Sequence, residues 1–470
     1  LKRFDQYGGV KAGPSAAASG FFRLENLNNR WWFITPEGNR FLLIGVDAVY
    51  HDESGYQMPL FKSPGITGVV RDVFTELPDR KLFPGAYNHY FGDGRVSFLL
   101  ANLQRKYGSV FDQKWADVTR RRLLDWGFNS HSKWSRHGRL RLPYITVLGP
   151  SGARRIDWAV DPFDPGFPLA VENGVKKLAK DDPWLVGHTF ESETGWNSTI
   201  VQKALRGNSG CAAKKAVIDF LASRYKQDLG RVNALLNVNA GSFAELTDLV
   251  VDKPELPAQD VSDFIRLASY QYYKIASQII RKHDPNHLLL GSSLDPGTWQ
   301  SSEEWATGGA EFLDALSFDT YAGTPDWIRP YRKYGKPILL LEFSFYAAGR
   351  GMRGLSKLLP DQKTRGLHYR YQVEQLAANP LMVGFGWFMY YDEPVGGRSL
   401  DGEDFNNGLL NLCDQPYTEM IGEMKKTNRR MYGIHSGQVE PLTPYSEMLE
   451  EMKKQMKPAS RESLNEDKRP

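Results

Sequence analysis

Three glutamates occupy positions that suit acid–base or nucleophilic chemistry. Glu342 ends the apolar run ILLL at 338–341, where a carboxylate is costly to bury unless it has a role or an ion-pair partner. Glu191 and Glu193 follow a second apolar run, WLVGHTF at 184–190. Two carboxyl groups that flank a glycosidic bond can hydrolyse it, because one protonates the leaving oxygen while the other attacks the anomeric carbon or activates water. The pattern therefore predicts glycoside hydrolysis.

The second member of this pair is ambiguous between Glu191 and Glu193. Residues i and i+2 of an extended strand point to the same face, so both side chains could reach one site. A nearby like charge raises the pKa of a carboxyl group, as a general acid requires. Chemistry alone leaves the choice open, and the remaining glutamate would then be a structural or substrate-binding carboxylate.

The scaffold must bring the ends of two distant strands together. Eight short, continuous apolar runs suit strands that are buried on both faces, and helical patterns alternate with them. This alternation predicts βαβ units, and eight strands favour closure into a single α/β (β/α)8 barrel of the TIM type. The predicted strands are 41–49, 127–134, 144–149, 184–193, 287–294, 315–321, 336–345 and 383–391, and the clearest predicted helices are 112–127, 264–284, 362–380 and 418–433.

The barrel is expected to span residues 41–445, preceded by a lead-in and small β cap at 1–40. The charged segment 446–470 is poor in aliphatic residues and is predicted to be a disordered tail. Long insertions at 50–111 and 194–263 follow predicted strands one and four. Because the active sites of barrels form at the carboxyl ends of the strands, these insertions are expected to wall a substrate cleft.

Other polar and aromatic residues mark the predicted strand ends. A tyrosine near the nucleophile could hold it ionised through a hydrogen bond, and a tryptophan on the last strand could form the floor of the sugar site. A single histidine is more often a satisfied core residue than a site residue, so the shared location of the histidines on strand ends is what favours a role. These candidates are Asp47, His51, Asn129, His131, Trp134, His188, Asp319, Tyr321, Trp387, Asp392 and Glu393.

Composition restricts the kinds of partner. The net charge is +4 over 470 residues with no basic stripe, so a nucleic-acid partner is not expected. No apolar run reaches 18 residues, so no membrane span is expected. Aromatic residues make up 13% of the chain, and many stand in loop-like contexts where their rings could stack on sugars. A polysaccharide or oligosaccharide is the expected partner, and the oligomeric state is left open.

The sequence motifs do not predict a cofactor or a catalytic metal. There is no G-x-S-x-G elbow, Walker motif or H-E-x-x-H, so neither a cofactor nor a catalytic metal is expected, although an acidic loop at 392–404 leaves a structural Ca²⁺ open. Cys211 and Cys413 lack metal-binding spacing, and their pairing is left open. The chain begins at Leu1 rather than Met, which suggests a cleaved leader and a secreted or periplasmic protein.

The motifs resemble those of the clan A glycoside hydrolases and, among them, the β-agarase-like families. The segments 21–49 (FFRLENLNNRWWFITPEGNRFLLIGVDAV) and 106–135 (KYGSVFDQKWADVTRRRLLDWGFNSHSKWS) are similar to the parts that form the first two strands of those enzymes. DPFDPGF, VGHTFESETGW, LLLEFSF and GFGWFMYYDEPVGGRSLDGEDFNNGLLN follow in the same order. The resemblance covers residues 21–435 and implies a barrel that cleaves β-glycosides.

Clan A enzymes carry the acid/base at the end of strand four, usually after an asparagine, and the nucleophile at the end of strand seven. The resemblance therefore implies Glu193 as acid/base and Glu342 as nucleophile, and the Gly-Trp at 195–196 supports Glu193 over Glu191. Ser192 stands where the asparagine that contacts the sugar 2-hydroxyl is usual, so that contact is expected to differ. The resemblance adds Glu191, Ser192, Trp196 and Glu403 to the substrate-binding candidates, Glu403 in the loop after strand eight.

The resulting hypothesis is a retaining glycoside hydrolase that cleaves agarose or a related galactan by double displacement. A first alternative stays in the clan: a β-galactosidase, β-mannanase or β-glucanase. A second alternative, to which Ser192 gives some weight, is a barrel that binds carbohydrate without cleaving it.

Overall fold

Eight parallel strands in chain order form the central sheet of the computed structural model. Every neighbouring pair among β4, β7, β8, β11 and β12, and among β13, β14, β15 and β4, is parallel. The structure describes residues 3–11, 16–51, 56, 58–59, 76–87, 94–135, 138–297, 302–321, 324–356 and 358–443. The predicted tail at 446–470 and much of the insertion at 50–111 lie outside these residues.

Each barrel strand falls on one of the runs predicted from the sequence. The strands are β4 (Leu43–Val46), β7 (Ser130–His131), β8 (Tyr144–Leu148), β11 (Leu185–Phe190), β12 (Leu288–Leu289), β13 (Leu316–Asp319), β14 (Ile338–Phe343) and β15 (Met382–Trp387).

A parallel bridge beyond β12 closes the ring. Leu294 bridges Phe318 of β13. The Leu294 N–H donates to the Ser317 carbonyl at 2.9 Å, and the Asp319 N–H donates to the Leu294 carbonyl at 3.0 Å. These contacts join the last two neighbours of the eight strands, and the predicted (β/α)8 barrel is confirmed.

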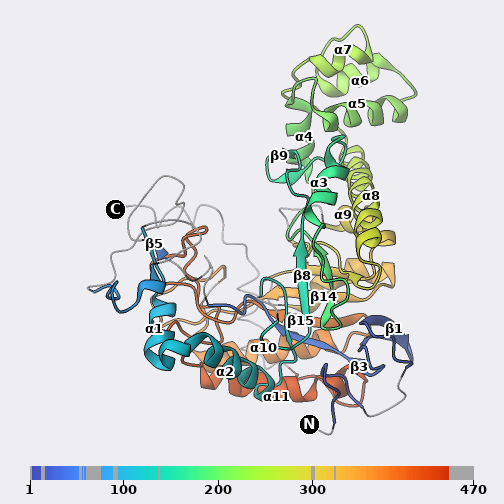
Figure 1. Ribbon diagram of the computed structural model, residues 1–470. Helices are drawn as coiled ribbons and strands as arrows, with labels where there is room; N and C mark the ends of the chain where they lie inside the picture. Colours follow the sequence, from blue (N-terminus) through green and yellow to red (C-terminus); the bar gives the residue numbers. More distant parts are fainter. Residues whose placement is uncertain are drawn as a thin grey trace.

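The helices cover the outside of the barrel and extend beyond it (Figure 1). The four predicted helices correspond to α2, α8, α10 and α11, and α8 begins earlier than expected. The α-helices are α1 (Phe98–Tyr107), α2 (Phe111–Asp125), α3 (Phe167–Gly174), α4 (Ser198–Arg206), α5 (Ala212–Arg224), α6 (Leu229–Leu236), α7 (Phe243–Asp248), α8 (Ala258–His283), α9 (Ser302–Gly309), α10 (Gln362–Ala377) and α11 (Thr418–His435). Short 3-10 helices are η2 (Pro84–Ala86), η3 (Gly108–Val110), η4 (Ala310–Phe312) and η5 (Pro325–Tyr334).

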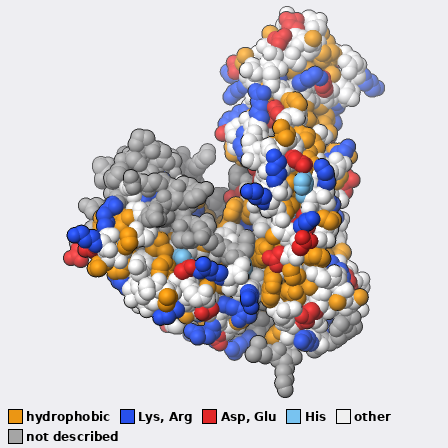
Figure 2. Space-filling model, viewed as in Figure 1, with side chains coloured by type: hydrophobic (Ala, Val, Ile, Leu, Met, Phe, Trp, Pro, Cys, Tyr) orange, Lys and Arg blue, Asp and Glu red, His pale blue; other side chains and the backbone are white. Residues whose placement is uncertain are grey.

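The insertion after strand four forms an arm. Helices α4 to α7 and the start of α8 project away from the barrel, which gives the molecule an L-shaped outline (Figure 1). On the face shown in Figure 2, basic and acidic side chains are interspersed along this arm and the barrel. Cys211 precedes α5 and Cys413 lies near the carboxyl end of the barrel chain, and both thiols are free.

The amino-terminal segment closes one end of the barrel. Strands β1 (Arg23–Leu27), β2 (Arg30–Ile34) and β3 (Arg40–Phe41) form an antiparallel sheet, as the predicted β cap requires. Four aromatic side chains of this region join the apolar interior of the barrel strands in one cluster: Tyr7, Phe22, Phe33 and Phe41 with Leu43, Ile145, Val186, Leu290, Ala315, Leu339, Leu341 and Val383. The smaller strands form two antiparallel pairs, β5 (Met58–Pro59) with β6 (Arg95–Val96) and β9 (Arg155–Ile156) with β10 (Ala159–Val160).

Polar residues replace this apolar interior toward the carboxyl ends of the strands. Leu43 belongs to the sealed interior, and Asp47 follows it by four residues, a spacing that keeps the same face of a strand. Glu342 directly follows Leu341 of this cluster, where the pairing of β14 with β15 is irregular between Leu340 and Phe343, and Asp319 is the last residue of β13. Apolar side chains therefore fill one end of the barrel, and the carboxylates lie at the other end.

Candidate active site

The two candidate catalytic glutamates meet at the carboxyl ends of their strands. Glu193 lies three residues beyond the end of β11, and Glu342 is part of β14. Carboxylate oxygens of Glu193, Asp319 and Glu342 all lie within 4.8 Å of one another. Retaining glycosidases place their two carboxyl groups about 5–5.5 Å apart, whereas inverting enzymes need about 6.5–9.5 Å to admit a water. The spacing suits direct attack by one of the carboxylates.

The backbone beyond β11 decides which glutamate faces Glu342. Glu191 and Glu193 have φ values of 61° and 50°, in the left-handed region that residues other than glycine rarely adopt. The expectation that both side chains follow extended strand geometry is therefore wrong. The Glu191 N–H donates to the Leu148 carbonyl at 2.6 Å, and the Glu193 N–H donates to the Ser292 carbonyl at 3.1 Å. The chain thus turns between neighbouring strands, and Glu193 lies beside Glu342.

Glu191 is held by partners of its own. It forms an ion pair with Arg155 of β9 and accepts a hydrogen bond from the Tyr272 hydroxyl of α8 at 2.7 Å. The Thr194 hydroxyl is a further donor at 3.4 Å. Glu191 still borders the cleft, so it remains a candidate for positioning the arm or contacting substrate.

Glu193 has the protonation behaviour of a general acid. Burial, followed by the negative charge of Glu342, raises the pKa of Glu193 to about 7. A carboxyl group with this pKa is protonated over a useful range near neutral pH, as proton donation to a leaving oxygen requires.

Glu342 is surrounded by donors. The Trp134 indole N–H donates to Oε1 at 2.7 Å, and the Tyr321 hydroxyl donates to Oε2 at 3.1 Å. The Lys133 ammonium lies 2.9 Å from Oε1. Hydrogen bonds and a positive charge on a carboxylate both favour its ionised form. Tyr321 thus makes the hydrogen bond that was expected from a tyrosine near the nucleophile.

Lys133 was not among the residues singled out from the sequence. Its side chain is 0% exposed, and its ammonium also contacts Asp319 and donates to the Ser192 hydroxyl at 2.9 Å. A lysine is almost never fully buried without a partner. The position of Lys133 inside the run predicted as the second strand was the signal that could have identified it.

Other predicted residues border this group. Ser192 donates to Asp319 Oδ2 at 3.1 Å and thereby links the strand-four and strand-six ends. Asp47 is fully buried, and burial together with the charge of Glu342 raises its pKa well above the ordinary value. A Cβ added at Gly386 would lie 3.1 Å from Asp47 Oδ1, so the glycine leaves room for this carboxyl group.

The loop after β15 places Glu403 close to Glu193. Arg398 pairs with Glu403 and, at 3.0 Å, with Glu393. Glu403 contributes to the raised pKa of Glu193, although less than burial and Glu342 do. The acidic loop at 392–404 was considered as a possible Ca²⁺ site from the sequence. In the structure it has an arginine, Arg398, among its carboxylates.

A cleft opens beside the glutamate pair. It has a volume of 530 Å³, and its lining includes Trp134, Arg155, Glu193 and Glu342. A neighbouring cavity of 730 Å³ is also lined by Trp134 and Glu342 and extends to Arg398. Trp134 is 44% exposed, so an aromatic face borders the cleft where a sugar ring could stack.

Three candidates of the first two strands make structural contacts. His51 Nε2 contacts Asp112 of α2 at 3.0 Å. Asn129 accepts from the Ile44 N–H at 2.9 Å and donates to the Leu42 carbonyl at 2.8 Å, which ties the second strand to the first. His131 is buried and stacks on Tyr144, with ring centroids 5.6 Å apart. These contacts give each residue a structural part in the barrel wall, and its substrate role stays a prediction.

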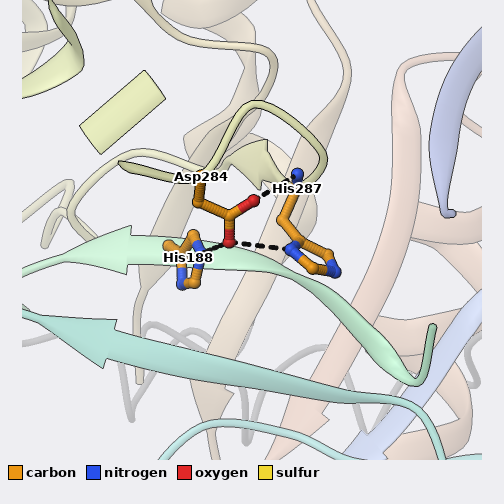
Figure 3. Close-up of side chains that lie close together, drawn as sticks. All are labelled: His188, Asp284 and His287. Carbon is orange, nitrogen blue, oxygen red and sulfur yellow. Dashed lines mark hydrogen bonds and ion pairs between the residues drawn. The ribbon is translucent and has the colours of Figure 1, made fainter. Parts of the chain in front are cut away.

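His188 belongs to a separate buried cluster (Figure 3). Its Nε2 lies 2.9 Å from Asp284 Oδ2, and His287 Nδ1 lies 2.8 Å from the same oxygen. His188 Nδ1 contacts the Thr146 hydroxyl at 2.6 Å, and His287 Nε2 contacts the Asp182 carbonyl at 3.0 Å. The cluster ties β11 to the end of α8, and His188 also borders the 730 Å³ cavity, so its substrate role stays a prediction.

Two predicted tryptophans are core residues. Trp196 is 0% exposed, and its indole N–H donates to the Val160 carbonyl at 2.9 Å. Trp387 is also 0% exposed, and its N–H donates to the Asn407 carbonyl at 3.0 Å. Both rings are buried here, so their roles in binding stay predictions, and Trp134 presents an exposed aromatic face beside the pair.

The fold and this site define a barrel of the clan A type, with two glutamates at the carboxyl ends of its fourth and seventh strands. No protein-family model matches the chain. It is 30% identical to β-agarase B of Vibrio sp. strain JT0107 in an alignment 480 residues long, which covers 91% of this chain and 50% of that protein. No helix in the described part of the chain has the length and apolar character of a membrane span.

Solved structures show the same relationship. The agarase AgWH50C aligns with a TM-score of 0.81 and 26% identity, over 93% of this chain and 68% of that one. PfGH50B aligns with a TM-score of 0.80 and 25% identity, over 93% and 69%. The chain is thus related to the β-agarases, and the resemblance read from its motifs is confirmed. It spans about half the length of the curated relatives that it matches.

Proposed function

We propose that this chain hydrolyses β-glycosidic bonds of agarose, or of a closely related galactan, with retention of anomeric configuration. The main support is the close approach of Glu193 and Glu342, whose nearest carboxylate oxygens lie within 4.8 Å. This is near the separation of about 5–5.5 Å in retaining enzymes and short of the roughly 6.5–9.5 Å in inverting ones. The relationship to β-agarase B supports agarose as the polymer.

The two carboxyl groups have different environments, and each environment suits one role. Glu342, with a cation and two neutral donors on its oxygens, attacks the anomeric carbon as the ionised nucleophile. Glu193, with its pKa raised to about 7, protonates the departing oxygen. The glycosyl ester on Glu342 is then hydrolysed by a water that Glu193 deprotonates.

A polymeric substrate also implies where the protein works. Agarose chains are too large to cross a membrane unaided, so the proposal includes action outside the cytoplasm, on the polymer outside the cell or on its fragments in the periplasm. Cell fractionation with an antibody to this chain tests that part, and a purely cytoplasmic signal contradicts it.

The first test is a hydrolysis screen of agarose, porphyran, galactan, mannan and β-glucan. We expect sugar release from agarose or a related galactan, lost in Glu193→Gln and in Glu342→Gln, while Glu342→Gln still binds the polymer. Glu423→Gln is the matched control, because Glu423 on α11 is 7% exposed, as Glu342 is, and pairs with Arg370 instead.

The product anomer tests the mechanism. Proton NMR during the first turnovers should show the β-anomer before mutarotation, and an initial α-anomer contradicts retention. Release only from mannan or β-glucan would support one of the other clan A activities. Binding without release from any polymer would support the carbohydrate-binding alternative.

A further inference from the structure

The cleft beside the glutamate pair continues past Glu193 into a smaller cavity. The first cavity, of 530 Å³, and the second, of 280 Å³, share part of their lining, which includes Arg155, Glu191 and Glu193. Among the described residues, Glu342 lines the first cavity and not the second, whereas Trp158 lines the second and not the first. The smaller cavity therefore lies on the Glu193 side of the pair.

The chemistry proposed for the pair gives this cleft a direction. The nucleophile bonds to the sugar whose anomeric carbon it attacks, and the acid/base protonates the oxygen of the sugar that leaves. The retained sugar is therefore expected beside Glu342, and the leaving part of the chain beside Glu193 and beyond it. The smaller cavity lies where the leaving sugar has to be.

A short hairpin forms one wall of the smaller cavity. Strands β9 and β10 pair antiparallel with Ile156 opposite Ala159, so Asp157 and Trp158 make the turn between them. Asp157 has a φ of 58°, a left-handed conformation that aspartate adopts more readily than most residues. The turn thereby places Trp158 at the cavity.

The β9–β10 hairpin is tied to the acid/base loop and to the arm. Trp196, which follows Glu193 closely in the chain, donates its indole N–H to the Val160 carbonyl at 2.9 Å. Lys203 of α4 pairs with Asp157 in the turn, and β9 lies beside α4 in Figure 1. A sugar bound to the hairpin would therefore have a fixed position relative to Glu193.

The side chains of the hairpin match the chemistry of a sugar. The ring of Trp158 is half-buried against the main hydrophobic core, and the Lys203 Nζ lies 5.8 Å from its centroid. A partly exposed indole offers a flat apolar surface to the C–H groups of a sugar ring. The side chain of Arg155 is 42% exposed; it donates to the Trp158 carbonyl at 2.6 Å and pairs with Glu191. Within the described part of the chain, these contacts leave other N–H groups of the guanidinium for sugar hydroxyls.

The charges at the hairpin are balanced. Arg155 pairs with Glu191, and Lys203 pairs with Asp157. An anionic substituent would have to compete with a carboxylate for either cation, whereas a hydroxyl group can accept from Arg155 without displacing Glu191. This wall of the cleft therefore suits an uncharged sugar.

We propose that the β9–β10 hairpin binds the leaving sugar of the substrate, with Trp158 stacking on its ring and Arg155, held by Glu191, donating to its hydroxyl groups. The inference rests on the proposed function, because that function decides which side of Glu193 the leaving sugar occupies. It assigns an uncharged galactan unit to this side of the cleft.

Transfer of the retained sugar to an added acceptor reports on this site. The glycosyl ester on Glu342 can react with water or with a hydroxyl group of an acceptor sugar. In the second case the ester C–O bond breaks, the acceptor oxygen bonds to the anomeric carbon, and its proton passes to Glu193. The acceptor has to occupy the place that the leaving sugar vacated. Because transfer and hydrolysis share one intermediate, their ratio does not depend on the amount of folded enzyme.

Arg155→Met and Trp158→Ala should each lower the ratio of transfer to hydrolysis by about tenfold, the value of about one hydrogen bond from a charged group or one aromatic contact. Mass spectrometry of the products, with agarose oligosaccharides as donor and acceptor, measures the ratio. Arg155→Met decides the proposal if Trp158→Ala does not fold, because the Arg155 side chain is largely outside the core.

Trp31→Ala is the matched control. Trp31 is also half-buried, but it lies in the β cap at the opposite end of the barrel, where its indole N–H donates to the Gly335 carbonyl at 3.0 Å. It should leave the ratio unchanged.

A sulfated galactan oligosaccharide used as acceptor tests the charge of the site. We expect wild type to transfer to the neutral acceptor in preference to the sulfated one. Glu191→Gln, which leaves Arg155 without its carboxylate partner, should reduce that preference. A wild-type preference for the sulfated acceptor would contradict a site for an uncharged sugar.

Affinity provides a measurement that needs no turnover. In the Glu342→Gln background, calorimetry with agarose oligosaccharides of increasing length should show a loss of about tenfold on adding Arg155→Met. We expect this loss only for oligosaccharides long enough to extend past Glu193. The affinity series decides the proposal if wild type forms no transfer product.

The outcomes separate the two proposals. If hydrolysis occurs and neither Arg155→Met nor Trp158→Ala lowers transfer or the affinity for long oligosaccharides, the hairpin site is overturned and the function stands. If wild type hydrolyses no polymer but Arg155→Met weakens the binding of long oligosaccharides, the function is overturned and the hairpin still binds sugar. An equal loss in Trp31→Ala also overturns the hairpin site, because the effect is then not local.

Discussion

Two clusters of titratable side chains in this barrel look alike by distance and differ in chemistry. Glu193, Asp319 and Glu342 form one, and His188, Asp284 and His287 form the other, and in each the polar atoms lie within 4.8 Å. The histidine cluster pairs one carboxylate with two imidazoles, and each ring nitrogen contacts a protein partner. The glutamate cluster has more carboxyl groups than cations and borders a cleft.

The two clusters also differ in backbone conformation. Glu193 and its neighbour Glu191 adopt left-handed conformations, as do Ala48 and Trp134 at the ends of β4 and β7. His188 lies within regular strand β11, and Asp284 caps the end of α8. Conformations that cost free energy persist where surrounding structure enforces them, often at functional sites. Surplus charge together with such backbone distinguishes a reactive cluster from a structural one.

The largest expected effect that tests this comparison is on turnover by Glu193→Gln. Loss of a general acid/base lowers a rate by about 10²–10⁴-fold, so kcat on polysaccharide should fall by that factor with the melting temperature nearly unchanged. An aryl glycoside with a good leaving group should suffer less in the first step. A lower melting temperature without a lower kcat would contradict the assignment of the glutamate cluster as the reactive one.

The next effect is on stability, from Asp284→Asn. Removing this carboxylate leaves the buried imidazoles of His188 and His287 without their shared acceptor, which costs about 1–3 kcal/mol for each unsatisfied donor, measured by denaturant unfolding. Despite burial, the hydrogen bonds from His188 and His287 lower the pKa of Asp284, so its stabilisation is full above the unfolded pKa of about 4 and is lost as pH falls below that value. The cost of the substitution should therefore shrink in acid. Asp157→Asn, whose partner Lys203 is exposed, should cost less than about 1 kcal/mol.

The wild-type pH profile sharpens the comparison further. Glu193 must be protonated to act, and its pKa is about 7, so activity should fall about tenfold per pH unit well above that value. Unfolding measured over the same range should not follow this limb. A basic limb that moves together with stability would mean that the decline reports unfolding rather than Glu193.

The smallest effects come from a pair of tryptophans. Trp134→Phe removes the 2.7 Å hydrogen bond to Glu342 and should lower kcat by about tenfold, the value of about one hydrogen bond to a charged group. Trp196→Phe removes the bond to Val160 from the core and should cost about 1–3 kcal/mol of stability with KM unchanged. A rise in KM for Trp196→Phe alone would support its predicted role in binding.

The amino-acid sequence by itself determined the architecture and the neighbourhood of the site. Strands buried on both faces tend to be apolar along their length, so most of the eight left apolar runs that the observed strands follow. The exception is β7, Ser130–His131, which lies in the largely polar segment 127–134. The ends of such runs are where polar groups first appear, which is why Glu193 and Glu342 stood out. A charged residue within or just after an apolar run is costly to bury unless it has a partner or a role, so it can be recognised from the local sequence.

Tertiary structure alone decided which polar groups meet. Lys133 and Asp319 are 186 residues apart in the chain, and no local pattern records their contact. The left-handed turn at Glu191 and Glu193 separates two side chains that strand periodicity would have placed together. His188 and Trp387 lie on the predicted strands but contact the surrounding shell, because each strand of a barrel has an inner and an outer face. Closure of the ring determines which side chain lies on which face, and it thereby selects the site.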